Sequence, residues 1–297
     1  MKLSFLFLLI FIPVKLVSVP SLDEYSNFTL PFLLPTCLSL SSSKGQLLTL
    51  LGTHHTHDQS DSQFKTIKNK WDDFIKKIDA KKNPQEKTAV VVVESSYHSP
   101  YAGYSNSISA IQNDCDRGFA SWLSRQKENV SLVGAELTHQ EIVQRLFVEY
   151  DQDLVLYFCF AQALLYWSNA QTSNVESFVI ERVHNWTGKT TITFKDLVAL
   201  HKKLTGKSFN AHSNFFQNIM NLECHNSLLG SFFSVFSRAP HFRKKFHHLL
   251  KRSHQIRDSH ALGVISNEWK QGKNVFVVYG AFHAIALKDS LKKLTQE

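Results

Sequence analysis

Apolar residues along this chain recur with two different periods, and the two periods together predict an α/β fold. From Phe64 to Ile78 the apolar positions fall three and four residues apart, with Lys and Asp between them, which predicts an amphipathic helix. The run Ala89–Val93 holds four consecutive valines and is followed by Glu94. Such a run predicts a strand that is buried on both faces, as in a parallel sheet with helices on each side.

Three further segments have the pattern of strands: Gln46–Leu51, Val130–Glu136 and Asn274–Tyr279. Further helices are predicted at Gly118–Gln126, Thr138–Tyr150, Leu154–Trp167, Phe194–Leu204, Asn214–Leu222 and Pro240–Lys270. We therefore expect a single α/β domain over 46–297, with a parallel or mixed sheet, flanking helices and a helical cap inserted at about 150–240.

The first residues have the pattern of a secretory signal. Lys2 precedes an apolar run, 3–14, that is too short to span a bilayer, and Val17-Ser18-Val19 offers a site for cleavage. We expect a signal peptide at 1–19 and a Pro- and Ser-rich lead-in at 20–45, so that the protein is secreted or periplasmic. An uncleaved membrane anchor is the alternative.

Composition narrows the function classes only slightly. Hydrophobic residues make up 43% of the 297 positions and charged residues 20%, which excludes an intrinsically disordered chain. The formal net charge of +8 favours acidic partners weakly, and no nucleic-acid partner is expected. The basic segment 241–252 is interpreted as a solvated helix face, with peripheral membrane contact as the alternative.

Cysteine and serine patterns point to no standard site. The four cysteines are Cys37, Cys115, Cys159 and Cys224. Their spacing matches no zinc-binding motif, and they could pair into disulfides in three ways. Cys159 stands between aromatic residues and is expected to be a buried thiol. Ser95 and Ser96 lie outside the Gly-x-Ser-x-Gly pattern, so a serine hydrolase is not expected.

Three polar motifs follow predicted strands. Gly52-Thr53-His54-His55 ends the first strand, Glu94 ends the valine strand, and Gly280-Ala281-Phe282-His283 ends the last. Because ligands sit at the carboxyl ends of parallel strands, we expect His55, Glu94 and His283 to converge there. The glycines would let the chain turn sharply and approach a ligand closely.

Two more residues are expected at the same edge. The helix from Arg257 to Lys270 rises about 21 Å and the strand after it covers about 23 Å, so an antiparallel arrangement brings Arg257 and Asp258 near His283. Glu136 reaches the edge by ending the third strand. Arg257 could neutralise an oxyanion or grip an anionic group, with a structural ion pair as the alternative.

Two imidazoles and one carboxylate suit a divalent metal, so His55, Glu94 and His283 are the predicted ligands. A metal would acidify a bound water or polarise a carbonyl, and without one a His–Glu pair can activate water as a general base. His54 and His57 are expected to support the site or to be solvated. A metal pair His55-x-His57 in an amidohydrolase barrel is disfavoured, because too few strand–helix units are visible to build eight.

As an ordered set, these motifs resemble the TraB/GumN–Tiki–ChaN group, and also the erythromycin esterases. The resemblance is carried by Leu51–His55, Val93-Glu94, Arg257-Asp258 and Val277–His283. That group pairs two Gly-x-x-His motifs with an intervening Glu and an Arg shortly before the second motif. The resemblance implies that His55, Glu94 and His283 form the core site, with Arg257 and Glu136 as supporting catalytic groups.

Members of this group differ in what they do. Tiki proteins are metal-dependent proteases, erythromycin esterases are hydrolases that use a His-activated water, and ChaN-like members bind haem or iron. Our leading hypothesis is a metal-assisted hydrolase that cleaves an ester or peptide bond in a small-molecule or peptide substrate. The alternatives are a non-enzymatic haem or iron binder, and a degenerate member that binds a partner through 150–240.

Overall fold

The computed structural model describes residues 35–96, 103–169, 174–206, 208–209 and 240–296. Its strands are β1 (Thr36–Ser41), β2 (Leu47–Thr53), β3 (Ala89–Val93), β4 (Val130–Gly134) and β5 (Asn274–Gly280). Its helices are α1 (Ser62–Asp79), the short 3-10 helix η2 (Pro84–Lys87), α2 (Ser107–Ser124), α3 (His139–Glu149), α4 (Gln152–Asn169), α5 (Val175–Thr187), α6 (Phe194–Thr205), α9 (Pro240–Lys270) and α10 (Ala281–Leu294). The predicted signal peptide, the predicted helix Asn214–Leu222 and Cys224 lie outside the described residues.

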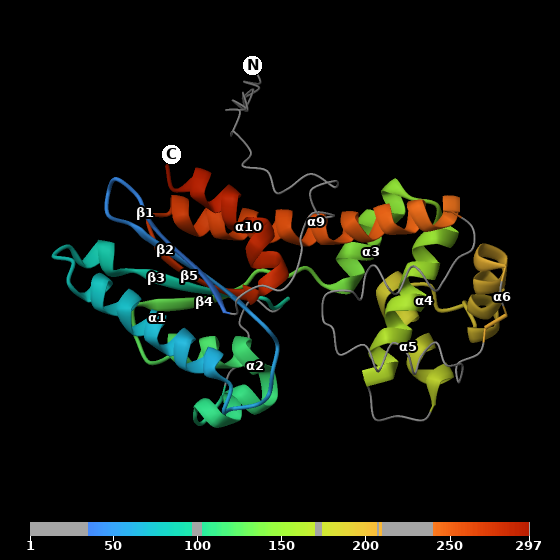
Figure 1. Ribbon diagram of the computed structural model, residues 1–297, viewed down its shortest axis with the longest axis horizontal. Coiled ribbons are helices and arrows are strands. Elements are labelled where there is room, and N and C mark those ends of the chain that lie inside the picture. Colours follow the sequence, from blue (N-terminus) through green and yellow to red (C-terminus); the bar gives the residue numbers. More distant parts are fainter. Residues whose placement is uncertain (1–34, 97–102, 170–173, 207, 210–239, 297) are drawn as a thin grey trace, which may run out of the picture.

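The expected α/β fold is confirmed, with a mixed sheet in the strand order β1-β2-β5-β3-β4 (Figure 1). Strands β2, β5, β3 and β4 run parallel to their neighbours, and β1 pairs antiparallel with β2. The last strand of the chain therefore lies in the middle of the sheet. Because Thr53 pairs with Gly280, the ends of β2 and β5 stand side by side.

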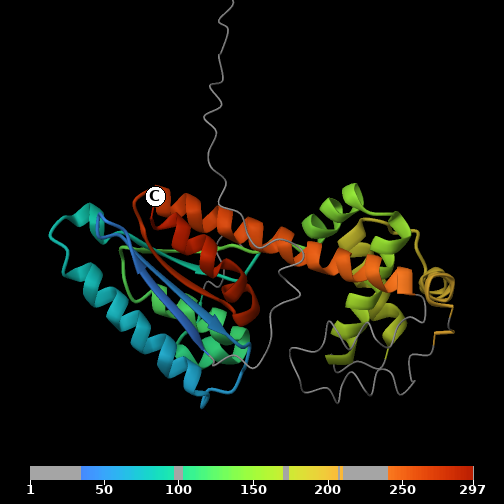
Figure 2. The same ribbon diagram turned by 45° about the horizontal axis from the view of Figure 1, so that its top comes forward.

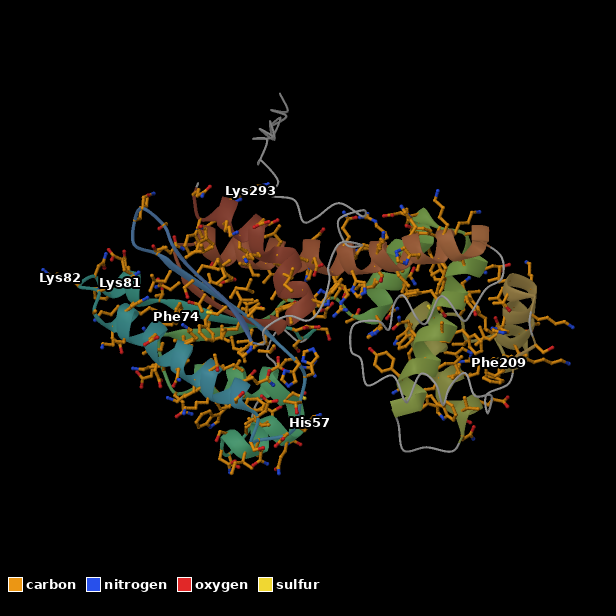
Figure 3. The ribbon with its side chains drawn as sticks, viewed as in Figure 1. His57, Phe74, Lys81, Lys82, Phe209 and Lys293 are labelled. Carbon is orange, nitrogen blue, oxygen red and sulfur yellow. The ribbon has the colours of Figure 1, made fainter. Side chains whose placement is uncertain are left out.

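Strand alternation explains the valine run, because successive side chains point to opposite faces of the sheet. Val91 and Val93 pack in one core with α1 and α2, whereas Val90 and Val92 pack in another core with α9 and α10. Figure 3 labels Phe74, which α1 contributes to the first of these cores. The sheet is thus covered on both faces, as predicted.

Five helices form a second, helical part beside the sheet. Helices α3 to α6 and the first half of α9 share a core that includes Val155, Phe160 and Phe246. Helix α9 spans both parts in the two ribbon views (Figures 1 and 2). Its Ile256 belongs to the helical core and its Ala261 to the sheet core, so Arg257 and Asp258 lie where the two cores meet.

Four elements differ from expectation. Strand β1 falls in the predicted lead-in. It is the edge strand beside β2, and its side chains alternate between half-buried and exposed. Helix α5 was not predicted. Helix α10 was also not predicted: it begins directly after Gly280, whose position has no side chain to cap the helix and so gives no sequence signal of a helix start. Helix α2 starts at Ser107 rather than Gly118, because two helical pieces join across a kink at Asp114 and Cys115, the latter with φ 52°.

The cysteines, the apolar character of the helices and the basic segment can also be examined in the described residues. Cys159 is buried as a free thiol, and Cys37 and Cys115 are also free. No helix in the described ranges has the length and apolar character that crossing a bilayer needs. In the basic segment, Lys244 and Lys245 are exposed while Phe246 is buried, so membrane contact by 241–252 stays a prediction.

Candidate active site at the strand ends

The structure brings the five predicted site residues together at the carboxyl ends of the parallel strands. His55 lies two residues beyond β2, Glu94 directly follows β3, Glu136 lies two residues beyond β4, and His283 is in the first turn of α10. Glu94 stands at the centre. Its Oε2 is 3.5 Å from His55 Nε2, and its Oε1 is 3.9 Å from His283 Nε2.

Each imidazole is oriented by a buried aspartate. His55 Nδ1 donates to Asp116 Oδ1 at 2.8 Å, and His283 Nδ1 donates to Asp258 Oδ1 at 2.5 Å. Both aspartates are fully buried. Because each Nδ1 is held in this way, both Nε2 atoms are left to face Glu94.

Asp116 is a residue of the candidate site that the sequence analysis missed. It sits in α2 just after the kink, and it also accepts a hydrogen bond from the Thr53 hydroxyl at 2.7 Å. Its neighbours on the buried side of α2 include Phe119 and Ala120. A carboxylate on the apolar side of a helix is costly to bury unless it has a partner, and that mismatch was the signal in the sequence.

Arg257 ties the two glutamates together. Its Nε and Nη2 donate to the two oxygens of Glu136 at 2.7 and 2.9 Å, and Nη2 also donates to Glu94 Oε1 at 2.9 Å. The third nitrogen, Nη1, donates to no described residue. The glutamates thus fix the guanidinium while leaving one of its nitrogens free for a ligand.

Charge pairing shifts the pKa values in this cluster. Burial by itself would lower the pKa of His55, but its hydrogen bonds to Asp116 and Glu94 and their charges outweigh burial and raise this pKa to about 10. Burial would raise the pKa of Glu94, yet the hydrogen bond from His55 and the charges of His283 and Arg257 hold it well below its ordinary value. Glu94 is therefore a carboxylate at neutral pH.

The two motif glycines provide space rather than an unusual backbone conformation. Gly280 donates its N–H to Glu94 Oε2 at 2.7 Å, and a Cβ there would lie 3.0 Å from the same oxygen and 3.4 Å from His55 Nε2. At Gly52 a Cβ would lie 2.3 Å from the Thr36 hydroxyl of β1. Neither glycine has a positive φ, so the expected sharp turn is not their role.

A cavity of about 1240 Å³ opens on the cluster. One side of it, here called the charged wall, consists of His55, Glu94, Glu136 and Arg257. Another part of the lining, here called the aromatic wall, consists of His139, Tyr166 and Trp186 from the helical part. His283 is buried and does not line the cavity, so it acts behind Glu94 rather than on a bound molecule.

In the part of the chain that the structure describes, the neighbouring histidines form no hydrogen bond with the five site residues. His54 lies outside the cavity, and His57 is in its lining. His54 Nε2 contacts Asp61, the N-cap of α1, at 2.7 Å. His57 hydrogen-bonds through Nδ1 to the carbonyl of Gln112 at 2.9 Å, and Figure 3 shows it on the side of the sheet part that faces the helical part. The described strands form an open sheet, which excludes the barrel interpretation of His55-x-His57.

The predicted metal ligands fit an ion in type but are not arranged around one point. Two imidazole Nε2 atoms and a carboxylate are suitable donors, and the aspartates behind the imidazoles are typical outer partners of a metal site. However, Arg257 and Gly280 already engage both oxygens of Glu94. Within the described ranges, no group of three His, Cys, Asp or Glu side chains is placed to hold a metal.

Comparisons with known proteins add no relative. No family model matches this chain, and no curated protein or solved structure matches it significantly. Its function is therefore inferred from the geometry above.

Proposed function

We propose that this protein is a hydrolase that cleaves an ester or peptide bond in the cavity between the charged and aromatic walls. One observation carries the proposal: the cavity is reached both by an imidazole that a buried aspartate orients and by an arginine with one unengaged nitrogen. An oriented imidazole is the usual group for moving a proton to or from a reacting water. A fixed guanidinium suits the negative charge that develops on a carbonyl oxygen.

In this proposal His55 handles the proton. The pKa of His55 is about 10, so the neutral ring is the minor form at pH 7 and the rate should rise with pH toward 10. In that neutral form His55 Nε2 takes a proton from water as the water oxygen attacks the substrate carbonyl, and Asp116 stabilises the imidazolium that forms. Arg257 Nη1 faces the resulting oxyanion. When the tetrahedral intermediate collapses, His55 returns the proton to the departing alcohol or amine. The proton taken from water thus leaves with the alcohol or amine.

Glu94 and His283 then have positioning roles. Glu94 holds Arg257 and the backbone of Gly280, and His283 with Asp258 supports Glu94 from the buried side. A divalent metal remains a proposed cofactor that His55, Glu94 and His283 would hold, and it would supply a more acidic bound water. Membership of the TraB/GumN–Tiki–ChaN group and a secreted or periplasmic location likewise remain proposals.

The test is a screen of full-length protein against small-molecule esters and short peptides, with and without added divalent metals. His55→Gln and Asp116→Asn should each lower kcat/KM by about 10²–10⁴-fold in any active assay. The matched control is His54→Gln, on the same loop but outside the cavity, which should keep its activity. Activity that survives both His55→Gln and Asp116→Asn would remove the proposal.

Haem binding is the second candidate, because the cavity is large and its lining includes imidazoles and a phenol, His139, His254 and Tyr166. These are side chains that can ligate haem iron. Titration of the full-length protein with haemin should give a shifted Soret band that weakens in Tyr166→Phe or His139→Ala. An unshifted Soret band at stoichiometric haemin would exclude this function.

A further inference from the structure

Three aromatic rings from three helices meet in the lining of the cavity. His139 opens α3, Tyr166 lies near the end of α4, and Trp186 near the end of α5. The rings of His139 and Trp186 stack with centroids 4.7 Å apart and planes 14° from parallel. Tyr166 stands edge-on to both rings and hydrogen-bonds His139 Nε2 at 3.2 Å.

These rings are not simply part of the helical core. Tyr166 is 42% exposed, His139 is also exposed, and Trp186 only packs against the edge of the core. All three line the cavity that contains His55 and Arg257. Because large aromatic side chains are usually covered in a monomer, a group of them facing a cavity indicates a surface meant for a ligand.

The side chains of the aromatic wall are uncharged at neutral pH, and the charges of two nearby arginines contribute to this at His139. Burial and the charges of Arg257 and Arg182 lower the pKa of His139 to about 4, so its imidazole is neutral at neutral pH. Solvent reaches His139 inside the cavity, although protein surrounds it on most sides. Burial raises the pKa of Tyr166, which keeps its phenol protonated. A positively charged ring would meet the same repulsion that disfavours the imidazolium of His139.

We propose that the aromatic wall is a substrate subsite that takes a planar aromatic group, neutral or negatively charged. Its role in selecting a substrate rests on the proposed hydrolase function, but its binding of such a group does not. Flat rings gain offset or edge contacts with the stacked pair that saturated rings cannot make. The subsite would place the scissile bond of an aryl ester or aromatic amide toward His55 and Arg257.

Binding is measured by calorimetry on full-length protein with three probes of similar shape: 2-naphthoate, its fully saturated decalin carboxylate, and 2-naphthylmethylammonium. We expect naphthoate to bind at least about tenfold more tightly than either of the others. Trp186→Leu should weaken naphthoate binding by about tenfold, whereas Trp186→Phe should restore most of it. The control Trp122→Leu changes a tryptophan that stacks on Phe119 outside the cavity, and should leave binding unchanged.

The outcomes separate this inference from the proposed function. Equal binding of the aromatic and saturated probes, or unchanged binding in both Trp186→Leu and Tyr166→Leu, overturns the subsite. If naphthoate binds as expected but no ester or peptide is cleaved, the subsite stands and the hydrolase proposal fails. If aryl and alkyl esters are cleaved equally, and Trp186→Leu and Tyr166→Leu leave the preference unchanged, the hydrolase proposal stands and the subsite fails.

Discussion

The two walls of the cavity are stabilised in different ways. On the charged wall the side chains are fixed by charged partners from other elements, as Asp116 fixes His55 and Glu136 fixes Arg257. On the aromatic wall the rings are held mainly by one another. Under the proposed function, the chemistry would depend on the charged wall, where partners from other elements hold each group, and selection of the substrate on the aromatic wall, where a ring could be exchanged at lower cost.

The largest expected effect comes from a matched pair of core truncations. Phe276→Ala removes a fully buried ring between Trp71 and Phe74 in the sheet part, and Phe160→Ala removes a buried ring from the helical core. Each should lower the free energy of unfolding by about 3–5 kcal/mol. Hydrogen exchange by mass spectrometry should show faster exchange in β3 and β5 only for Phe276→Ala. Equal loosening of the sheet in both variants would show that the two parts do not differ in this way.

The next effect compares two arginines of α9. Arg257→Gln leaves the buried Glu94 and the nearly buried Glu136 without their cation, and should cost up to about 3–5 kcal/mol of unfolding free energy. Arg252→Gln breaks an ion pair with the more exposed Glu149, and should cost about 1 kcal/mol or less. Chemical denaturation of both variants measures the difference. Similar losses would mean that the two glutamates are solvated and that Arg257 does not organise the charged wall.

Metal binding should depend on the predicted ligands His55, Glu94 and His283, and not on the aromatic wall. A divalent metal at 100 times its dissociation constant would stabilise the fold by about 2.7 kcal/mol. A metal held by His55, Glu94 and His283, which would require these side chains to rearrange, should raise the melting temperature of the native protein and of His139→Ala, but not of His55→Ala or His283→Ala. Metal content of the purified proteins provides the second measurement. Absence of bound metal in the native protein, together with no thermal shift, would leave His55 and Arg257 to act without one.

The smallest effect is a difference in pH dependence. The pKa of His55 is raised from 6.5 to about 10, so its contribution to stability is complete below pH 6.5 and is lost as the pH rises through 10. The pKa of His139 is lowered to about 4, so stability falls as the pH drops from 6.5 toward 4. In unfolding curves against pH, His55→Gln should reduce the alkaline loss and His139→Gln the acid loss. Interchanged effects would contradict the assigned charge states.

The contrast between the two walls also explains which site residues could be placed from the sequence alone. Strand periodicity fixes where a strand ends, so the residues after β2, β3 and β5 could be placed together without coordinates. Asp258 was placed near His283 by matching the lengths of a helix and a strand. Asp116 could not be placed, because its direction depends on the kink at Cys115, which no local pattern marks.

The helical part could be predicted only as a set of helices. Helix α4 is buried around most of its circumference, so its sequence has no polar face to show which side meets the cavity. Helix α5 was missed altogether, and it carries Trp186. The aromatic wall is a product of how three helices pack, and neither spacing nor composition contains that information.

Helix α9 runs without a break through both cores, and this continuity has a consequence for how such a chain could vary. Each residue of a helix turns the chain by 100°. One residue inserted near His260 would rotate Arg257 and the whole preceding half of α9 away from Glu94 and Glu136, whereas loops between α4, α5 and α6 could change length and leave that half in phase. Helix α9 therefore fixes the rotational orientation of the helical part relative to the sheet part. Changes to the helical part are expected to be tolerated only where they keep that orientation.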